Sequence, residues 1–306
     1  MSWLAWRQFR AQAALACAAV AVVIVALLIT RDHVADAFGP AGTGRLTGAY
    51  VWIRLLGTAL IGLPAIIGAF WGAPLVAREL ETRTYRMIWT QSATRTRWLA
   101  AKLAVAGIVA TAAVTIFATA FTWWAKPIDA TGSRISPAQF AQRGIVPVGY
   151  ALFGLALGTL AGIIVRRTLP AMAASLAGFF VVRIVLQNLV RSRLASTTTV
   201  NLPLFGPDGS TGWILSSHTV DAAGHAISAA VGLDNELATA CSLTRATPDI
   251  DRAFAACAEQ LGIRRIATVH ANGQFWTLQA AELGLYLVLA GAVLAVCFWW
   301  INHRTT

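Results

Sequence analysis

The sequence predicts an all-α polytopic membrane protein with six transmembrane helices, an N-terminal interfacial helix and an extracellular segment between spans five and six. Only 12% of the 306 residues are charged, whereas a soluble domain usually carries roughly 25%. The residues are 57% hydrophobic, and the mean hydropathy is +0.65. Six apolar runs each approach the ~20 residues that a helix needs to cross the hydrocarbon layer. They lie at about 11–30, 51–71, 99–124, 146–165, 169–189 and 278–301.

Residues 1–10 are expected to form a short interfacial helix. At about 100° per residue, Trp3, Trp6 and Phe9 share one face, and two arginines lie beside it. A frayed N-terminus is the alternative. The next apolar run is about 20 residues long and has no clear A-x-A cleavage site, so it is interpreted as span one rather than a signal peptide.

The spans within 11–189 contain several features that affect packing. Pro64 lacks a backbone donor and should kink span two near its middle. Span four carries glycines at intervals of four, a spacing that lets helices approach closely in lipid. Packing within the chain and a subunit interface are both open uses of this stripe: Gly154, Gly158 and Gly162. Charge sits mostly at the ends of the spans, where Arg54 and Lys102 can extend toward water.

The distribution of Lys and Arg orients the helices. With the N-terminus inside, the cytoplasmic segments hold eleven basic residues, and the two short outer loops hold five. Basic residues favour cytoplasmic loops, so both termini are expected in the cytoplasm. The formal net charge of +11 then reflects membrane topology. It does not indicate nucleic-acid binding.

Residues 72–102 form a basic segment between two apolar runs. Within it, residues at about 77–91 are predicted to form an amphipathic helix, with Glu79 and Glu81 near its positively polarised N-terminus. This helix either lies on the membrane surface or sits in a groove of another subunit. In the second case the candidate contact residues are Arg78, Glu79, Leu80, Glu81, Tyr85 and Trp89.

Residues 190–276 form the one sizeable outer segment, and residues 277–306 follow as span six and a cytoplasmic tail. The outer segment holds most of the acids and looks too polar for a large core. Cys241 and Cys257 both lie in it, facing an oxidising compartment, so we expect a disulfide between them. Such a bridge would stabilise the segment by about 3 kcal/mol. The alternative, two metal ligands, lacks partner residues at suitable spacing.

The sequence contains no recognisable catalytic, metal-binding or nucleotide-binding motif, including the phosphate-binding pattern G-x-x-x-x-G-K-[ST]. The main intramembrane charge is Arg183 in span five, which is costly and therefore a functional hypothesis. Arg183 either binds an anionic group, pairs with Glu282 of span six, or extends outward beside Gln187 and Asn188. Glu282 either reaches outer water or lines an exit path.

Several motifs resemble those of ABC-2 type transporter permeases of actinobacteria. The most specific are W-G-A-P-L-V-A-R-E-L-E-T at 71–82, W-T-Q-S at 89–92 and T-R-x-R-W at 94–98. Similar matches are W-x-x-W-R-Q-F-R at 3–10, R-R-T-L-P-A-M-A-A at 166–174 and F-W-x-L-Q-x-x-E at 275–282. The resemblance spans nearly the whole chain and is weakest over 195–240.

This resemblance implies an ABCG-like, type V exporter membrane subunit in a bacterial plasma membrane. Two such subunits, identical or related, would pair among the membrane lipids. Each would dock a separate ABC ATPase, which binds ATP and magnesium, through a coupling helix at 77–91. The substrate would be hydrophobic, such as a drug, peptide or lipid. Its pathway would lie between spans two and five, near Phe70, Trp71, Phe179, Phe180 and Arg183. The outer segment would cap the exit.

Two other classes remain as alternatives. An ion-coupled secondary transporter would need ion sites near the midplane, often on broken helices, and only the expected kink at Pro64 hints at one. A membrane-embedded enzyme or sensor would need a catalytic cluster or a signalling domain, and the sequence displays neither. The direction of export rests on the resemblance alone.

Overall fold

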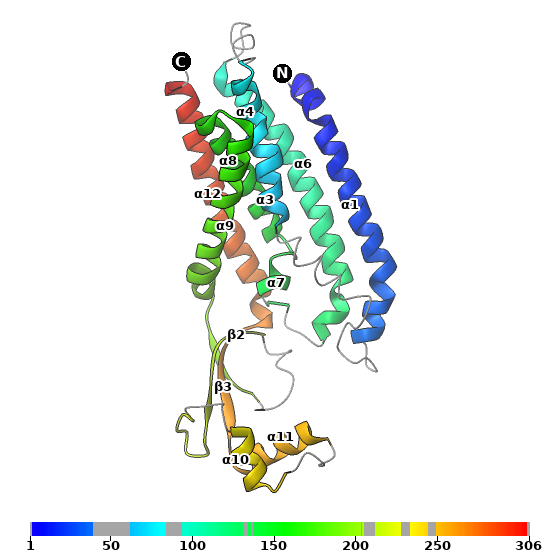
Figure 1. Cartoon of the computed structure of the whole chain (residues 1–306), viewed down its shortest axis with the longest axis vertical. Helices are drawn as coiled ribbons and strands as arrows, with labels where there is room; N and C mark the ends of the chain where they lie inside the picture. Colours follow the sequence, from blue (N-terminus) through cyan, green and yellow to red (C-terminus); the bar gives the residue numbers. More distant parts are fainter. Residues whose placement is uncertain are drawn as a thin grey trace. The chain divides into compact units, whose positions relative to one another are not determined.

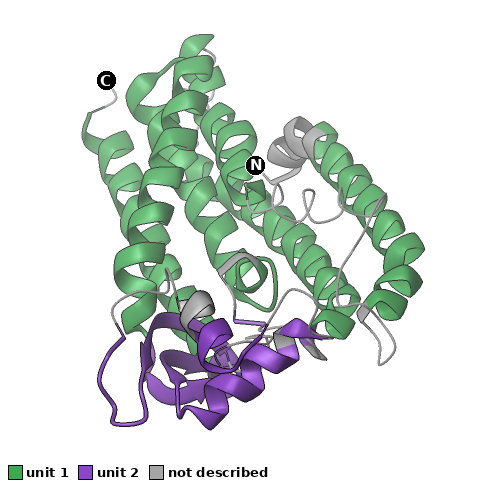
Figure 2. Cartoon of the chain, turned by 60° about the horizontal axis from the view of Figure 1, so that its bottom comes forward, with its two compact units in different colours: residues 1–128, 138–194, 276–306 green, residues 129–137, 195–275 purple. Residues whose placement is uncertain are grey.

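A computed structural model gives the fold of the chain (Figure 1) and describes residues 2–38, 62–83, 94–130, 134–135, 137–202, 204, 212–227, 233–243 and 249–304. The chain divides into two compact units (Figure 2). Unit 1 comprises residues 1–128, 138–194 and 276–306, and unit 2 comprises residues 129–137 and 195–275.

Unit 1 is a helical bundle, which confirms the predicted fold class. Among the described residues, six helices are long and apolar enough to cross a membrane: Ala13–Ala37, Leu63–Glu81, Arg95–Trp124, Val146–Val165, Thr168–Arg193 and Asn272–His303. The two ends of the chain lie at the same end of this bundle (Figure 1), which we call the N/C end. The α-helices are α1 (Ser2–Phe38), α3 (Leu63–Ile67), α4 (Ala73–Glu81), α6 (Arg95–Trp124), α7 (Pro137–Phe140), α8 (Val146–Val165), α9 (Thr168–Val185) and α12 (Phe275–His303). Shorter elements are the π-helices η2 (Gly68–Gly72) and η4 (Leu186–Val190) and the 3₁₀ turn η5 (Arg191–Arg193). The 3₁₀ turn η3 (Lys126–Ala130) crosses into unit 2, and the 3₁₀ turn η6 (Asn272–Gln274) belongs to unit 2.

The N-terminal region differs from the expected separate helix at 1–10. Helix α1 runs from Ser2 to Phe38 without a break, so residues 2–10 are its first turns. Neither Pro nor Gly occurs between Ser2 and Phe38. These are the residues that most readily interrupt a helix, and an Ala-rich stretch continues the helix directly into span one.

The second span is less regular than predicted. Elements α3, η2 and α4 follow one another from Leu63 to Glu81, whereas the prediction was 51–71; residues 51–61 lie outside the described part of the chain. Pro64 occupies the first turn of α3, where its missing N–H costs no helical hydrogen bond. The expected kink at Pro64 in mid-span is therefore wrong. The irregularity lies instead in the π-helix that follows.

Helix α8 packs closely against the second span through glycines. A Cβ atom on Gly158 would collide with the backbone oxygen of Gly68, and one on Gly162 would lie 2.5 Å from the backbone oxygen of Ala73. Gly72 approaches α8 in the same way, since a Cβ there would lie 2.5 Å from a backbone oxygen of α8. Of the two uses left open for the glycine stripe, the structure thus provides packing within the chain.

Unit 2 contains a small antiparallel sheet that the sequence analysis did not predict. Its strands β1 (Thr198–Leu202), β2 (Gly212–Val220) and β3 (Arg264–Ala271) have the order β1-β3-β2. The strands are rich in Thr, Val and Ile, which favour extended backbone. Buried Leu202, Ala267 and Val269 form a small apolar cluster on the sheet.

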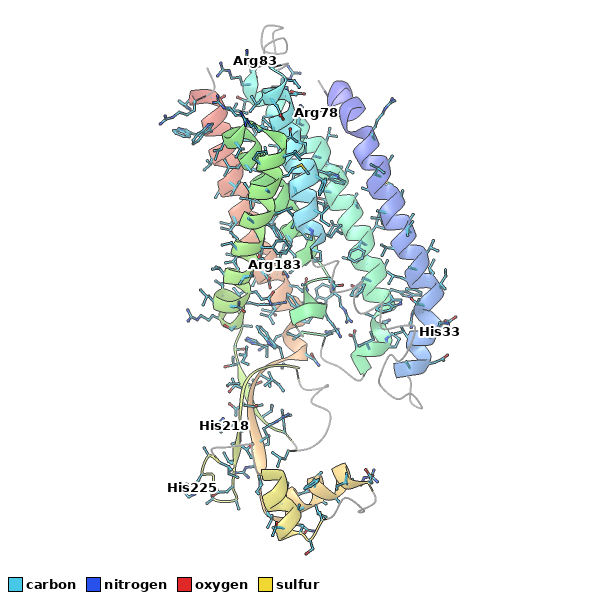
Figure 3. The ribbon with its side chains drawn as sticks, viewed as in Figure 1. His33, Arg78, Arg83, Arg183, His218 and His225 are labelled. Atoms are coloured by element: carbon cyan, nitrogen blue, oxygen red, sulfur yellow. A yellow bond between two sulfur atoms is a disulfide. The ribbon has the colours of Figure 1, made fainter. Side chains whose placement is uncertain are left out.

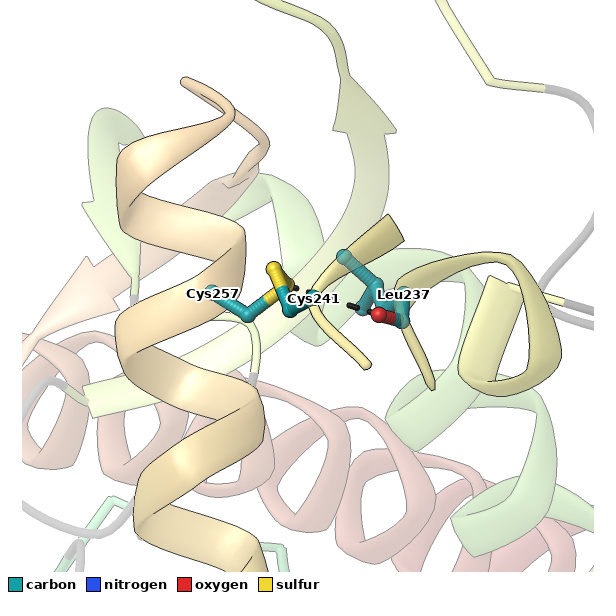
Figure 4. Close-up of a disulfide and its surroundings, with 3 residues drawn as sticks. All are labelled: Leu237, Cys241 and Cys257. Atoms are coloured by element: carbon teal, nitrogen blue, oxygen red, sulfur yellow. Dashed lines mark hydrogen bonds between the residues drawn. A yellow bond between two sulfur atoms is a disulfide. The ribbon is translucent and has the colours of Figure 1, made fainter. Parts of the chain in front are cut away.

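Two helices of unit 2 are joined by the predicted disulfide. Cys241 lies just after α10 (Leu233–Ala240), and Cys257 lies on α11 (Ile250–Gln260). The bond between the two sulfurs (Figure 4) confirms this pairing. Cys257 is 3% exposed and packs against Leu237 of α10, so the bridge supports a core of only a few residues.

Candidate functional site

Helix α4 brings a charged sequence to the N/C end of the bundle. It ends at Glu81, and Arg83 has a positive φ of 59°, which turns the chain away from the helical path. A single helix covering 77–91 therefore does not form. Tyr85 and Trp89 belong to the predicted contact set and lie outside the described residues.

The four described members of that set point in different directions. Arg78 and Glu81 are exposed, whereas Glu79 and Leu80 are each 9% exposed. Leu80 belongs to an apolar cluster with residues of α6 and α12. Figure 3 shows Arg78 together with Arg83 at the N/C end. This alternation of exposed and buried side chains matches the amphipathic character expected for the segment. Two of the four side chains, however, face the core of the chain itself.

Glu79 connects α4 to α6 in a buried ion pair. The Nζ atom of Lys102 lies 2.5 Å from Oε1 of Glu79, and Nε1 of Trp98 donates to Oε2 at 3.2 Å. Lys102 also donates to the backbone oxygen of Leu75 at 3.0 Å. Lys102 is 8% exposed, so it does not extend to water as the sequence analysis expected. A buried charge is tolerated when it is paired and hydrogen-bonded, and this lysine meets both conditions.

Glu81 connects the same end of α4 to the start of α9. Its Oε2 accepts hydrogen bonds from the backbone N–H of Thr168 at 3.0 Å and from the Thr168 hydroxyl at 2.6 Å. A helix N-terminus has unpaired N–H groups and a partial positive charge, which a carboxylate satisfies. The Thr168 side of this contact lies in the R-R-T-L-P motif at 166–170.

Two more bonds link the helices at this end. The Arg95 side chain of α6 donates to the backbone oxygen of Ile301 at 3.2 Å, and Arg166 donates to that of Arg304 at 3.4 Å. The helix ends that flank residues 82–94 are thus joined to α9 and to α12, and the residue that follows α8 is joined to the residue that follows α12.

The residues predicted to line a pathway are distributed over different environments. Phe70 and Phe180 are 52% and 43% exposed, whereas Phe179 is fully buried and its ring centre lies 6.0 Å from that of Phe153. Trp71 is half-buried and packs against a cluster between the second span, α6 and α8. The structure therefore leaves two of these aromatic side chains on the outer surface of the bundle and places the others inside it.

Arg183 belongs to a buried polar cluster in the half of the bundle away from the N/C end (Figure 3). Its guanidinium lies 3.9 Å from the ring centre of Tyr150. The Tyr150 hydroxyl donates to Oε1 of Glu282 at 2.5 Å, and Nε of Arg191 lies 3.2 Å from Oε2 of the same carboxylate. Glu282 is thus paired with Arg191, which the sequence analysis did not consider. Arg183 reaches Glu282 through Tyr150.

Gln279, one turn before Glu282, caps α8. Its Oε1 accepts hydrogen bonds from the backbone N–H groups of Ile145 and Val146 at 3.0 and 2.9 Å, and its Nε2 donates to the backbone oxygen of Phe140 at 3.2 Å. The motif F-W-x-L-Q-x-x-E at 275–282 therefore has a structural basis. Its Gln and Glu hold the start of α8 and the end of α9 against α12.

No group of three or more His, Cys, Asp or Glu residues within the described ranges is placed to hold a metal ion. The arrangement has the properties of a helical membrane scaffold in which charged side chains fix the helix ends.

Comparison with known proteins identifies the family. The family model described as ABC-2 membrane transporter related matches residues 11–191, which include the first five spans and both anchoring contacts of α4. No curated protein and no solved structure matches the chain. The chain belongs to the ABC-2 membrane transporter related family and is a transporter permease subunit.

Proposed function

We propose that this chain is the membrane-spanning subunit of an ATP-driven exporter and that it docks a separate ATPase at its N/C end. Proteins of this family generally work with a separate ATPase subunit. The observation that carries the proposal is the double anchorage of α4, through Glu79 to Lys102 and through Glu81 to Thr168. It supports a role in which a push on residues 82–94 moves α4, α6 and α9 together.

The N/C end faces the cytoplasm of a bacterial cell in this proposal. Its described surface exposes one carboxylate, that of Glu81, and several arginines. The exposed arginines are Arg78, Arg83, Arg97, Arg166, Arg167 and Arg304. The undescribed residues 84–93 add Arg86 and no acid. Positive charge concentrates on the cytoplasmic side of bacterial plasma-membrane proteins. Both termini are then cytoplasmic, and unit 2 lies outside.

The ATPase contacts the connection after α4, including Arg83, Tyr85 and Trp89, and it binds the ATP and magnesium. Glu79 and Leu80 are buried and act as anchors behind the contact surface. When two ATPases close on ATP, the segments that follow α4 in the two subunits move toward each other. Each bundle then moves as a rigid body between inward-open and outward-open states.

Two subunits form the pathway in this proposal, as a homodimer or with a related permease. Phe70 of the second span and Phe180 of α9 are exposed on the single subunit, and they face the partner subunit and a hydrophobic substrate. Trp71 and Phe179 support this surface from within. Arg183 holds the outer ends of α8 and α9 together.

The test is ATP hydrolysis and dye transport in proteoliposomes that contain the chain and its ATPase. Thr168→Val removes the hydroxyl bonded to Glu81 and should lower ATP-dependent transport while the ATPase stays bound. Thr119→Val is the matched control, because the Thr119 hydroxyl donates to the backbone oxygen of Thr115 within its own helix. Equal transport by both variants would count against the anchoring role. Uphill transport by the chain without any ATPase would favour an ion-coupled transporter instead.

A further inference from the structure

A groove of about 240 Å³ lies in unit 1 between three helices. Its lining residues all have apolar side chains or none, and they include Leu103 and Gly107 of α6, Leu152 and Leu155 of α8, and Leu287 and Gly291 of α12. The remaining lining residues are Ala or Leu. No side chain in the lining therefore offers a charge or a hydrogen bond to a ligand.

The groove lies at mid-height of the spans. Gly291 is 16 residues after the start of α12 at Phe275 and 12 before its end at His303. At about 1.5 Å per residue, this is about 24 Å and 18 Å along the helix. Since the hydrocarbon core is about 30 Å thick, a helix that spans it places Gly291 well inside the core, where no water is available to fill a hollow.

Two glycines create the space. A Cβ atom on Gly291 would meet nothing within 4 Å, and one on Gly107 would make ordinary contacts with two leucines of α8 at 3.8 and 3.9 Å. Leu287 is 42% exposed and Val288 is 71% exposed, so α12 presents this region to the surrounding bilayer. An empty hollow forfeits dispersion contacts on one side of every lining atom.

We propose that this groove binds one acyl chain of a bilayer phospholipid. A dry apolar cavity of about 150 Å³ is already large enough to hold a benzene-sized molecule, and this groove is larger. Hydrocarbon tails are the molecules present at this depth, and their chemistry matches the lining. None of the residues that line the groove is among those proposed for the pathway, which are Phe70, Trp71, Phe179, Phe180 and Arg183. The two proposals therefore rest on different residues and can fail independently.

The experiment uses the full chain in vesicles of phosphatidylethanolamine and phosphatidylglycerol that contain a phosphatidylglycerol with a diazirine at mid-chain. After irradiation, mass spectrometry locates the adducts. The wild-type chain should carry them on the leucines of the groove. Gly291→Leu and Gly107→Leu fill the groove from opposite walls, and each should lose these adducts.

Gly284→Leu is the matched control. Gly284 lies seven residues before Gly291 and hence on nearly the same face of α12, and a Cβ atom there also meets nothing within 4 Å. Its groove adducts should remain at the wild-type level, and circular dichroism should show equal helix content in all variants. Undiminished labelling in both filled variants would overturn the proposal. So would equal labelling by a lipid with its diazirine at the headgroup, or displacement of the adducts by a transported compound.

Discussion

Two buried carboxylates fix helix contacts in opposite halves of the bundle. Glu79 binds Lys102 and Trp98 at the N/C end, and Glu282 binds Tyr150 and Arg191 in the other half. A charge in an apolar interior is stable only with its partners in place. Each carboxylate therefore specifies which helices meet around it.

The pair of Glu79 and Lys102 should respond asymmetrically to substitution. Glu79→Leu leaves the Lys102 ammonium buried without a counter-charge, and we expect a loss of about 3–5 kcal/mol in stability. The double variant Glu79→Leu with Lys102→Met removes both charges and should recover most of this loss. Thermal unfolding of the purified protein in detergent measures the difference. Equal destabilisation by the single and double variants would show that the ion pair does not fix α4.

The hydroxyl of Tyr150 should contribute measurably to the second cluster. Tyr150→Phe removes a hydrogen bond to a charged acceptor, which is worth about 1.5–3 kcal/mol, and keeps the ring beneath Arg183. The melting temperature should fall. With Glu282→Gln already present, the same substitution should have a smaller effect, because the acceptor is then neutral. An unchanged melting temperature in the wild-type background would contradict the hydrogen bond.

The sequence identified Glu79, Glu81 and Arg183 as unusual, but it could not supply their partners. Lys102 was expected to extend toward water because it lies near the end of an apolar run, yet it turns inward to Glu79, 23 positions before it. Arg191 was not considered, since it lies at the edge of the outer segment in the sequence. Such pairings depend on which helices are neighbours. That information is absent from the local pattern.

At the scale of the elements, contact between α8 and the second span depends on the absence of side chains. Gly158→Ala should destabilise the bundle, because its Cβ would collide with the backbone of Gly68. Gly284→Ala is the control: a Cβ at Gly284 meets nothing, so the better helix propensity of Ala should stabilise by up to about 1 kcal/mol. The melting temperatures should therefore shift in opposite directions. Shifts of the same sign would argue against close glycine packing.

The hydrophobic runs predicted the number of spans, but they did not predict the irregular turns within the spans. The six spans follow from length and apolarity alone. The π-helix at Gly68–Gly72 and the end of α4 at Glu81 were not predicted. The first lies where the chain packs closely on α8, and the second lies where Glu81 bonds to α9. The sheet of unit 2 was also missed. Its strand β2 ends at Val220 and its partner β3 begins only at Arg264, so this pairing is not visible in a local sequence pattern.

The disulfide should matter for unit 2 and little for unit 1. Cys241→Ser combined with Cys257→Ser removes a bridge across 16 positions, which is worth about 3 kcal/mol. Since the core around it is small, we expect faster hydrogen exchange in α10 and α11. Exchange in α6 and α8 should stay as in the wild type. Unchanged exchange in both helices of unit 2 would show that this core is stable without the bridge.

For the whole molecule, composition and motifs were enough to predict a polytopic membrane protein of the ABC-2 type, and the family match over residues 11–191 agrees. The class of protein can be predicted because the lengths of the apolar runs, the positions of the charges and the motif around 71–98 are all local features of the sequence. The substrate, the proposed second subunit and the direction of transport correspond to no local motif of this kind. A single chain does not encode these as a readable pattern.

Site-specific photocrosslinking tests the docking surface most directly. A photoreactive phenylalanine analogue at Arg83, which is exposed just after α4, should form an adduct with the co-purified ABC ATPase. The same analogue at His218, which is exposed on β2 of unit 2, should form none. An adduct at His218, or none at Arg83 in a complex that still hydrolyses ATP, would contradict docking at the N/C end.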